Sequence, residues 1–125
     1  MSKPVPWPSL VAGEEVTIRI PGVSDADTEE GLDLEAATAI EWQLRRCPRK
    51  PGQDDDDEDN PVIVAKDLDD GITVDGADIL VELEAADTGE LAGTYWADCW
   101  VTIAGKRRLA KEPAPLEIGK AVNAP

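Results

Sequence analysis

The sequence predicts an all-β protein, because two alternating strands flank a tight corner within residues 77–103. A period of two puts apolar residues on one face of an extended strand. The corner, residues 87–95, contains two glycines and ends on a tyrosine. This pattern is typical of the corner at which an immunoglobulin-like sandwich passes from one sheet to the other. We therefore expect an immunoglobulin-like antiparallel β-sandwich of about seven strands. The alternating apolar residues are Ile79, Val81 and Leu83 before the corner, and Tyr95, Ala97, Cys99, Val101 and Ile103 after it.

The composition is compatible with one such domain and argues against several classes of function. A chain of 125 residues can build one two-layer core, and 42% hydrophobic residues without phenylalanine imply an aliphatic core suited to strands. The formal net charge is −15, from 27 acidic and 12 basic residues, so we expect neither nucleic acid nor a membrane as a partner. Histidine is absent, which removes the commonest general base and metal ligand. We expect no enzymatic activity, no cofactor and no metal.

Residues 1–13 are predicted to form an extended, proline-rich N-terminal arm. Pro4, Pro6 and Pro8 alternate with other residues, which excludes a helix and favours polyproline II. Trp7 lies in this arm and has two interpretations of equal weight. It folds back over an edge of its own sandwich, or it anchors the arm on a neighbouring subunit.

The sandwich itself is predicted to span residues 14–118. Its first strand is 15–20, which ends at Pro21-Gly22. Residues 34–46 form the next strand region, with Trp42 on the core face of a central strand. A helix over 33–46 is the alternative, because the segment begins with good helix formers, but the period of two continues through Leu44.

A long loop follows and carries the acidic segment 53–60. A run of carboxylates cannot fold by itself, so a solvated loop is the simplest interpretation. Calcium binding is a second one, although the order of residues is not that of an EF-hand loop. Steering toward a basic patch on a partner is a third.

The remaining strands are separated by turns at spacings typical of all-β sandwiches. Pro113 and Pro115 interrupt the last of them and predict that it lies at a sheet edge. Residues 119–125 are expected to be a loose C-terminal tail. The predicted strands are 62–65, 72–74, 78–85, 94–104 and a last one near 107–118.

Cys47 and Cys99 lie where an inter-sheet disulfide would be sought. Because Trp42 and Leu44 face inward, Cys47 falls on the opposite face, at the loop. We therefore expect two free thiols.

Trp96 and Trp100 share the outward face of the strand after the corner, together with Asp98 and Thr102. Two tryptophans on such a face are unusual for an isolated domain. Either the arm or an edge strand covers them, or they belong to a subunit interface. A sugar-binding site is a weaker alternative.

Several short segments together resemble the small immunoglobulin-like virion proteins of tailed bacteriophages, which serve as accessory subunits of the tail, baseplate or neck. The resemblance covers residues 14–118. It implies a structural role through contacts with other virion proteins as part of an oligomeric assembly, in a virion assembled in the bacterial host cytoplasm. It also implies that Tyr95 is the corner tyrosine, with its hydroxyl bonded to the backbone near Asp87. The segments are 33–44, 70–74, 78–83, 87–95 and 104–109.

Two other classes of function stay open. An acidic inhibitor that mimics DNA is suggested by the charge of −15. A carbohydrate-binding module is suggested by the paired tryptophans, and a capsid decoration protein is a further alternative, because the sequence does not separate it from a tail subunit. The first residues show no signal peptide, and no apolar run is long enough to span a bilayer.

Overall fold

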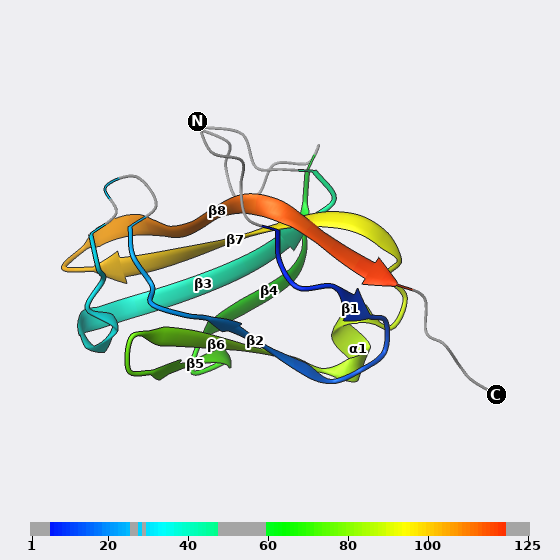
Figure 1. Ribbon diagram of the computed structural model, residues 1–125, viewed down its shortest axis with the longest axis horizontal. Helices are drawn as coiled ribbons and strands as arrows, with labels where there is room; N and C mark the ends of the chain where they lie inside the picture. The colour runs from blue at the N-terminus through cyan, green and yellow to red at the C-terminus, as the bar shows by residue number, and fades with distance from the viewer. Residues whose placement is uncertain (1–5, 26–27, 29, 48–59, 120–125) are drawn as a thin grey trace.

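The computed structural model describes residues 6–25, 28, 30–47 and 60–119, whose regular secondary structure is almost all β-strand (Figure 1). The predicted all-β class is confirmed. The elements are β1 (Leu10–Val11), β2 (Val16–Ile20), the 3-10 helix η1 (Leu34–Ala36), β3 (Ala37–Arg45), β4 (Val62–Leu68), β5 (Gly71–Asp75), β6 (Asp78–Leu83), the short helix α1 (Ala85–Thr88), β7 (Gly93–Ile103) and β8 (Lys106–Gly119).

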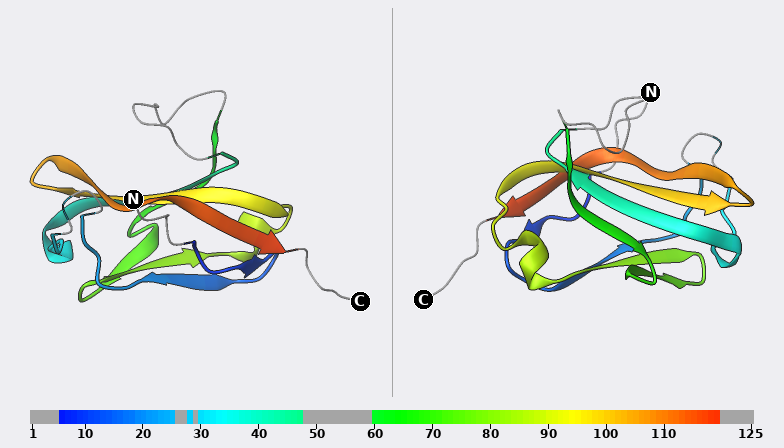
Figure 2. Two further views of the ribbon diagram at one scale, coloured as in Figure 1. Left: turned by 45° about the horizontal axis from the view of Figure 1, so that its top comes forward. Right: turned by 180° about the vertical axis from the view of Figure 1, so that it is seen from behind.

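The described strands form one sheet in the order β1-β8-β7-β3-β4-β5-β6-β2. The sheet bends over itself, so that β8, β7, β3 and β4 lie above β5, β6 and β2, as Figures 1 and 2 show. Its two end strands, β1 and β2, are consecutive in the chain and separated by residues 12–15. The sheet therefore comes close to closing into a barrel.

The chain passes from one layer to the other between β4 and β5. Asp69 and Gly71 both have positive φ, of 67° and 97°, and the Asp69 N–H bonds the carbonyl of Ile72 at 2.9 Å. A Cβ on residue 71 would lie 2.6 Å from Cδ of Lys66, so the lysine side chain would have to shift, and the positive φ is the main reason for glycine there. This tight crossing limits the pairing of β4 with β5 to two residue pairs.

The core fills the space between the layers. Alternation along β6 and β7 puts Ile79, Val81, Tyr95 and Val101 inside, as the period of two predicted. Trp42 is fully buried on β3, which pairs with β4 on one side and β7 on the other, so its predicted place on a central strand is also confirmed.

The second strand region begins later than predicted. Residues 34–36 form a turn of 3-10 helix, and the strand starts at Ala37. The Asp33 carboxylate accepts the Glu35 N–H at 3.2 Å and caps this turn. The helix-forming residues at the start of the segment thus make one turn, and the period of two governs the rest.

The described part of the predicted arm lies along the second half of β8. The N–H of Trp7 donates to the carbonyl of Pro115 at 3.0 Å, and that of Ala12 donates to Gly119 at 2.9 Å. Between them, β1 pairs in parallel with Ile118 and Gly119. A strand of two residues has no periodicity, which is why the sequence did not predict it.

The last strand was predicted at a sheet edge, but β8 is second from the edge. The prediction is wrong because β1 covers the end of β8. The prolines are tolerated because β1 reaches only residues 118–119 and the pairing with β7 shifts register between Ala97 and Trp100.

Candidate functional site

The face of β7 opposite the core carries the two outward tryptophans. Trp96 and Trp100 are half-buried, and the register sets them opposite Arg45 and Glu41 of β3. Between them, Asp98 lies opposite Gln43. We call this surface the tryptophan face; it comprises Glu41, Gln43 and Arg45 of β3, Trp96, Asp98 and Trp100 of β7, and Arg107 of β8.

The centre of the tryptophan face is polar but buried. Nη2 of Arg45 donates to Oε1 of Gln43 at 2.7 Å, and Nη1 lies 3.8 Å from Oδ2 of Asp98. The side chains of Arg45 and Asp98 are each only 2% exposed. Burying a charge is costly unless it is paired and hydrogen-bonded, so these groups hold one another in a defined arrangement.

Sequence reasoning missed this buried cluster. The alternation of β3 put Gln43 on the face opposite Trp42, and Arg45 was placed among the basic residues just before the acidic loop, which could close on that loop. The contact between Arg45 and Asp98 follows from the register of β3 with β7. On the other side of β3, the pairing with β4 is irregular between Leu44 and Arg45. The one usable signal was an arginine at the end of a strand of alternating residues, close to the loop.

Trp100 is covered on one ring face by an arginine. The guanidinium carbon of Arg107 lies 4.5 Å from the ring centroid, and its Nη2 lies 3.5 Å from Oε2 of Glu41. A cation over the face of an indole ring is attracted by the ring's quadrupole. Glu41 therefore contributes to holding Arg107 over Trp100.

Trp7 lies inside the domain. It is 5% exposed, its Nε1 donates to the carbonyl of Ala97 at 2.9 Å, and its ring meets that of Trp42 edge-on at 6.1 Å. Nζ of Lys111 lies 4.9 Å from the centroid of the Trp7 ring, and burial lowers the pKa of this lysine. This placement corresponds to the folded-back interpretation, and it leaves Trp7 little surface with which to anchor a neighbouring subunit.

Tyr95 lies at the corner, but its hydroxyl does not reach the backbone near Asp87. The hydroxyl donates to the carbonyl of Ala92 and accepts its N–H, both at 3.2 Å. Asp87 caps α1 instead, by accepting the N–H of Glu84 at 2.7 Å, and pairs with Lys66 of β4 at 2.8 Å. Asp87 lies within α1, whereas Ala92 lies between α1 and β7, close to Tyr95 along the chain.

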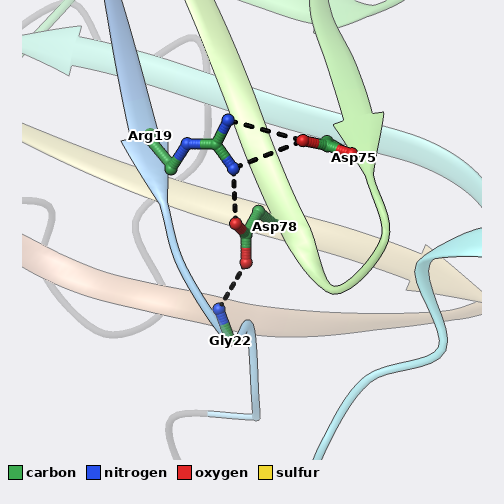
Figure 3. Close-up of polar contacts among 4 residues, drawn as sticks. All are labelled: Arg19, Gly22, Asp75 and Asp78. Carbon is green, nitrogen blue, oxygen red and sulfur yellow. Dashed lines mark hydrogen bonds and ion pairs between the residues drawn. The ribbon is translucent and has the colours of Figure 1, made fainter.

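A second polar cluster joins the strands of the other layer (Figure 3). Nη1 of Arg19, on β2, bonds Asp78 of β6 at 2.5 Å, and Nη2 lies 3.4 Å from Asp75 of β5. Asp78 also accepts the N–H of Gly22 at 2.9 Å, and these bonds hold its pKa below the ordinary value. The cluster is exposed and ties three neighbouring strands together.

The acidic segment 53–60 lies outside the described residues except for Asn60. The Asn60 amide closes the base of this loop, because its Oδ1 accepts the Cys47 N–H at 3.2 Å and its Nδ2 donates to the Cys47 carbonyl at 2.9 Å. Within the described ranges, no three acidic or cysteine side chains are grouped so that they could hold a metal ion.

The cysteines are free thiols, Cys47 exposed and Cys99 buried. Burial raises the pKa of Cys99, and the nearby charges of Asp98 and Glu41 raise it further. Cys99 is therefore an unreactive core residue.

Comparison of the chain with protein-family models, with curated proteins and with solved structures gives no match. In the described part of the chain, no helix is long and apolar enough to span a membrane. The candidate site therefore depends on its geometry alone.

Proposed function

We propose that this protein is a structural subunit of a tailed-phage virion, in the tail, baseplate or neck, that acts through protein–protein contacts made by the tryptophan face. The observation that carries this proposal is the pair Trp96 and Trp100 on one face, with Arg107 over one of the rings. Tryptophan and arginine are the residue types most enriched among those that dominate binding energy in protein interfaces.

The buried charges between the two tryptophans support the same role. Arg45, Gln43 and Asp98 are joined by side-chain contacts within β3 and β7. A surface that is already ordered loses less conformational entropy on binding than a mobile one. The tryptophan face is thus suited to a fixed partner rather than to a changing set of ligands.

The finer fold assignment, an immunoglobulin-like sandwich, is part of the proposal. In its support, the layer β8-β7-β3-β4 has the order of the G, F, C and C′ strands, and β5-β6-β2 has that of D, E and B. A buried tryptophan on the C-type strand, Trp42, and a corner tyrosine, Tyr95, are further features of that fold. The virion assignment itself comes from the resemblance of the sequence segments to phage proteins.

The alternatives are less well supported by the geometry of the site. A sugar would stack on an open indole face, whereas Arg107 already lies over Trp100. A DNA mimic would act through its carboxylates on a basic nucleic-acid-binding protein, and the tryptophan face would have no part in it.

The test is to probe purified particles of a phage that encodes this protein. We expect the protein at a fixed copy number in intact particles, retained after washing at high salt. Its absence from the particles, together with its capture by a DNA-binding protein of the host, would replace the proposal with the DNA-mimic alternative.

A further inference from the structure

The strand β2 ends the sheet with an open edge. It pairs with β6 from Val16 to Ile20, and no other described strand pairs with it. Its side chains alternate, with Ile18 and Ile20 buried and Thr17 and Arg19 exposed. A strand edge of this length presents unpaired backbone donors and acceptors, and it is a template for another strand.

We propose that β2 pairs with β2 of a second copy of this chain, in an antiparallel manner about a two-fold axis at Thr17. The β5-β6-β2 layers of the two copies would then join into one continuous sheet, with the strand order β5-β6-β2 of one copy followed by β2-β6-β5 of the other. This inference is independent of the virion assignment and uses a surface on the opposite layer from the tryptophan face.

The register follows from side-chain parity and charge. Directly opposite residues in an antiparallel pair lie on the same face, so Ile18 stays inward only if odd residues meet odd residues. With the axis at Thr17, Glu15 of one copy meets Arg19 of the other, and Val16 meets Ile18. Moving the axis to Glu15 or to Arg19 sets like charges opposite each other, which is destabilising. An axis at Val16 or Ile18 pairs no charges at all.

The surroundings of Glu15 favour the same register. An open pocket borders the start of β2 and the end of β6, lined by Glu15, Glu82 and Glu84 together with Thr17 and apolar residues. In the proposed pair, the second copy's Arg19 arrives beside these carboxylates. Arg19 uses its two Nη atoms for Asp75 and Asp78, and a guanidinium also carries an Nε–H donor that can take a third carboxylate.

The first test is the solution mass, by sedimentation velocity over a dilution series, of the full chain and two variants. Thr17→Glu sets two carboxylates opposite each other at the axis, and Thr73→Glu makes the same change at an exposed threonine of β5. We expect the wild type and T73E to dimerise. The dimer of T17E should have a dissociation constant at least ~10-fold higher than that of the wild type. A wild type that stays monomeric, or a dimer that T17E leaves unchanged, would overturn the proposal.

The second test works even where T17E lowers stability. Cα atoms of directly opposite antiparallel residues lie ~4.5–5.5 Å apart, within the range that a disulfide spans. In a Cys47→Ser background, Thr17→Cys should give a disulfide-linked dimer on mild oxidation, much faster than Thr73→Cys. Equal rates for T17C and T73C would contradict pairing at this edge.

Discussion

Nε1 of Trp7 donates a hydrogen bond to the carbonyl oxygen of Ala97 on β7, 90 residues further along the chain, at 2.9 Å. The bond ties the described start of the chain to β7, and the Trp7 ring meets that of Trp42 in the core. The N-terminal segment is therefore part of the folded domain from Trp7 onward.

Trp7→Ala should destabilise the protein by about 3–5 kcal/mol, the range for removing a buried tryptophan. The change removes the edge-on contact with Trp42 and leaves the Ala97 carbonyl without its donor. Denaturant unfolding measures the loss, with the exposed Ser9→Ala as a control that should leave stability unchanged. A tryptophan that served a neighbouring subunit alone would give W7A the stability of the wild type.

Asp98→Ala should cost more stability than the double variant Asp98→Ala, Arg45→Met. The single change leaves the Arg45 guanidinium buried beside a missing carboxylate, a loss of about 3–5 kcal/mol. The double change removes both charges and restores an apolar contact, so part of the loss should return. A double-mutant cycle on the free energies of unfolding gives the interaction energy between Arg45 and Asp98. Strictly additive losses would contradict the prediction that the two side chains interact.

Stability should fall as the pH drops below about 4. The pKa of Asp78 is held below its ordinary value by the Gly22 N–H and by Arg19. Burial raises the pKa of Asp87, but the hydrogen bonds from Lys66 and the Glu84 N–H outweigh this effect, so its pKa is also lowered. A carboxyl whose pKa is lower in the folded than in the unfolded state stabilises the protein above the unfolded value. That contribution is lost as pH falls through the folded value.

The check is to compare the denaturant midpoint at neutral pH and at about pH 3. Asp78→Asn with Asp87→Asn should lower the midpoint at neutral pH and show a smaller further decrease in acid than the wild type. An equal acid decrease in both proteins would show that other carboxyls cause it.

The two thiols should differ sharply in reactivity. A disulfide reagent should label Cys47 at once and Cys99 only after unfolding, because burial and neighbouring charge raise the pKa of Cys99. Cys47→Ser should abolish the fast reaction. Two fast thiols in the native protein would show that the core around Cys99 opens readily.

The sequence predicted every described strand except the two-residue β1, and the longer strands were predicted from their alternation. Trp42, Tyr95 and Val101 were assigned to the core from that period alone, and they lie there. The Arg45–Asp98 contact was beyond prediction, because it depends on which residue of β3 meets which residue of β7. That register is set by packing between segments more than 50 residues apart, not by either segment alone.

The site was predicted to a similar extent. The outward parity of Trp96 and Trp100 could be counted along one strand, so their common face was predictable. The position of Trp7 was not predictable, because a proline-rich segment has no alternation from which its contact surface could be inferred. The predicted hydroxyl partner of Tyr95 was wrong, because Asp87 lies inside α1 and the hydroxyl bonds Ala92, which lies between α1 and β7.

The measurement that tests the central claim most directly uses phage particles assembled without this protein, to which variants of it are added back. Trp100→Ala removes a half-buried apolar side chain from the tryptophan face, and Leu80→Ala removes one from the outer face of the other layer. We predict that the wild type and L80A co-sediment with the particles and that W100A, though folded, does not. Co-sedimentation of W100A at the wild-type level would contradict the assignment of the tryptophan face as the assembly surface.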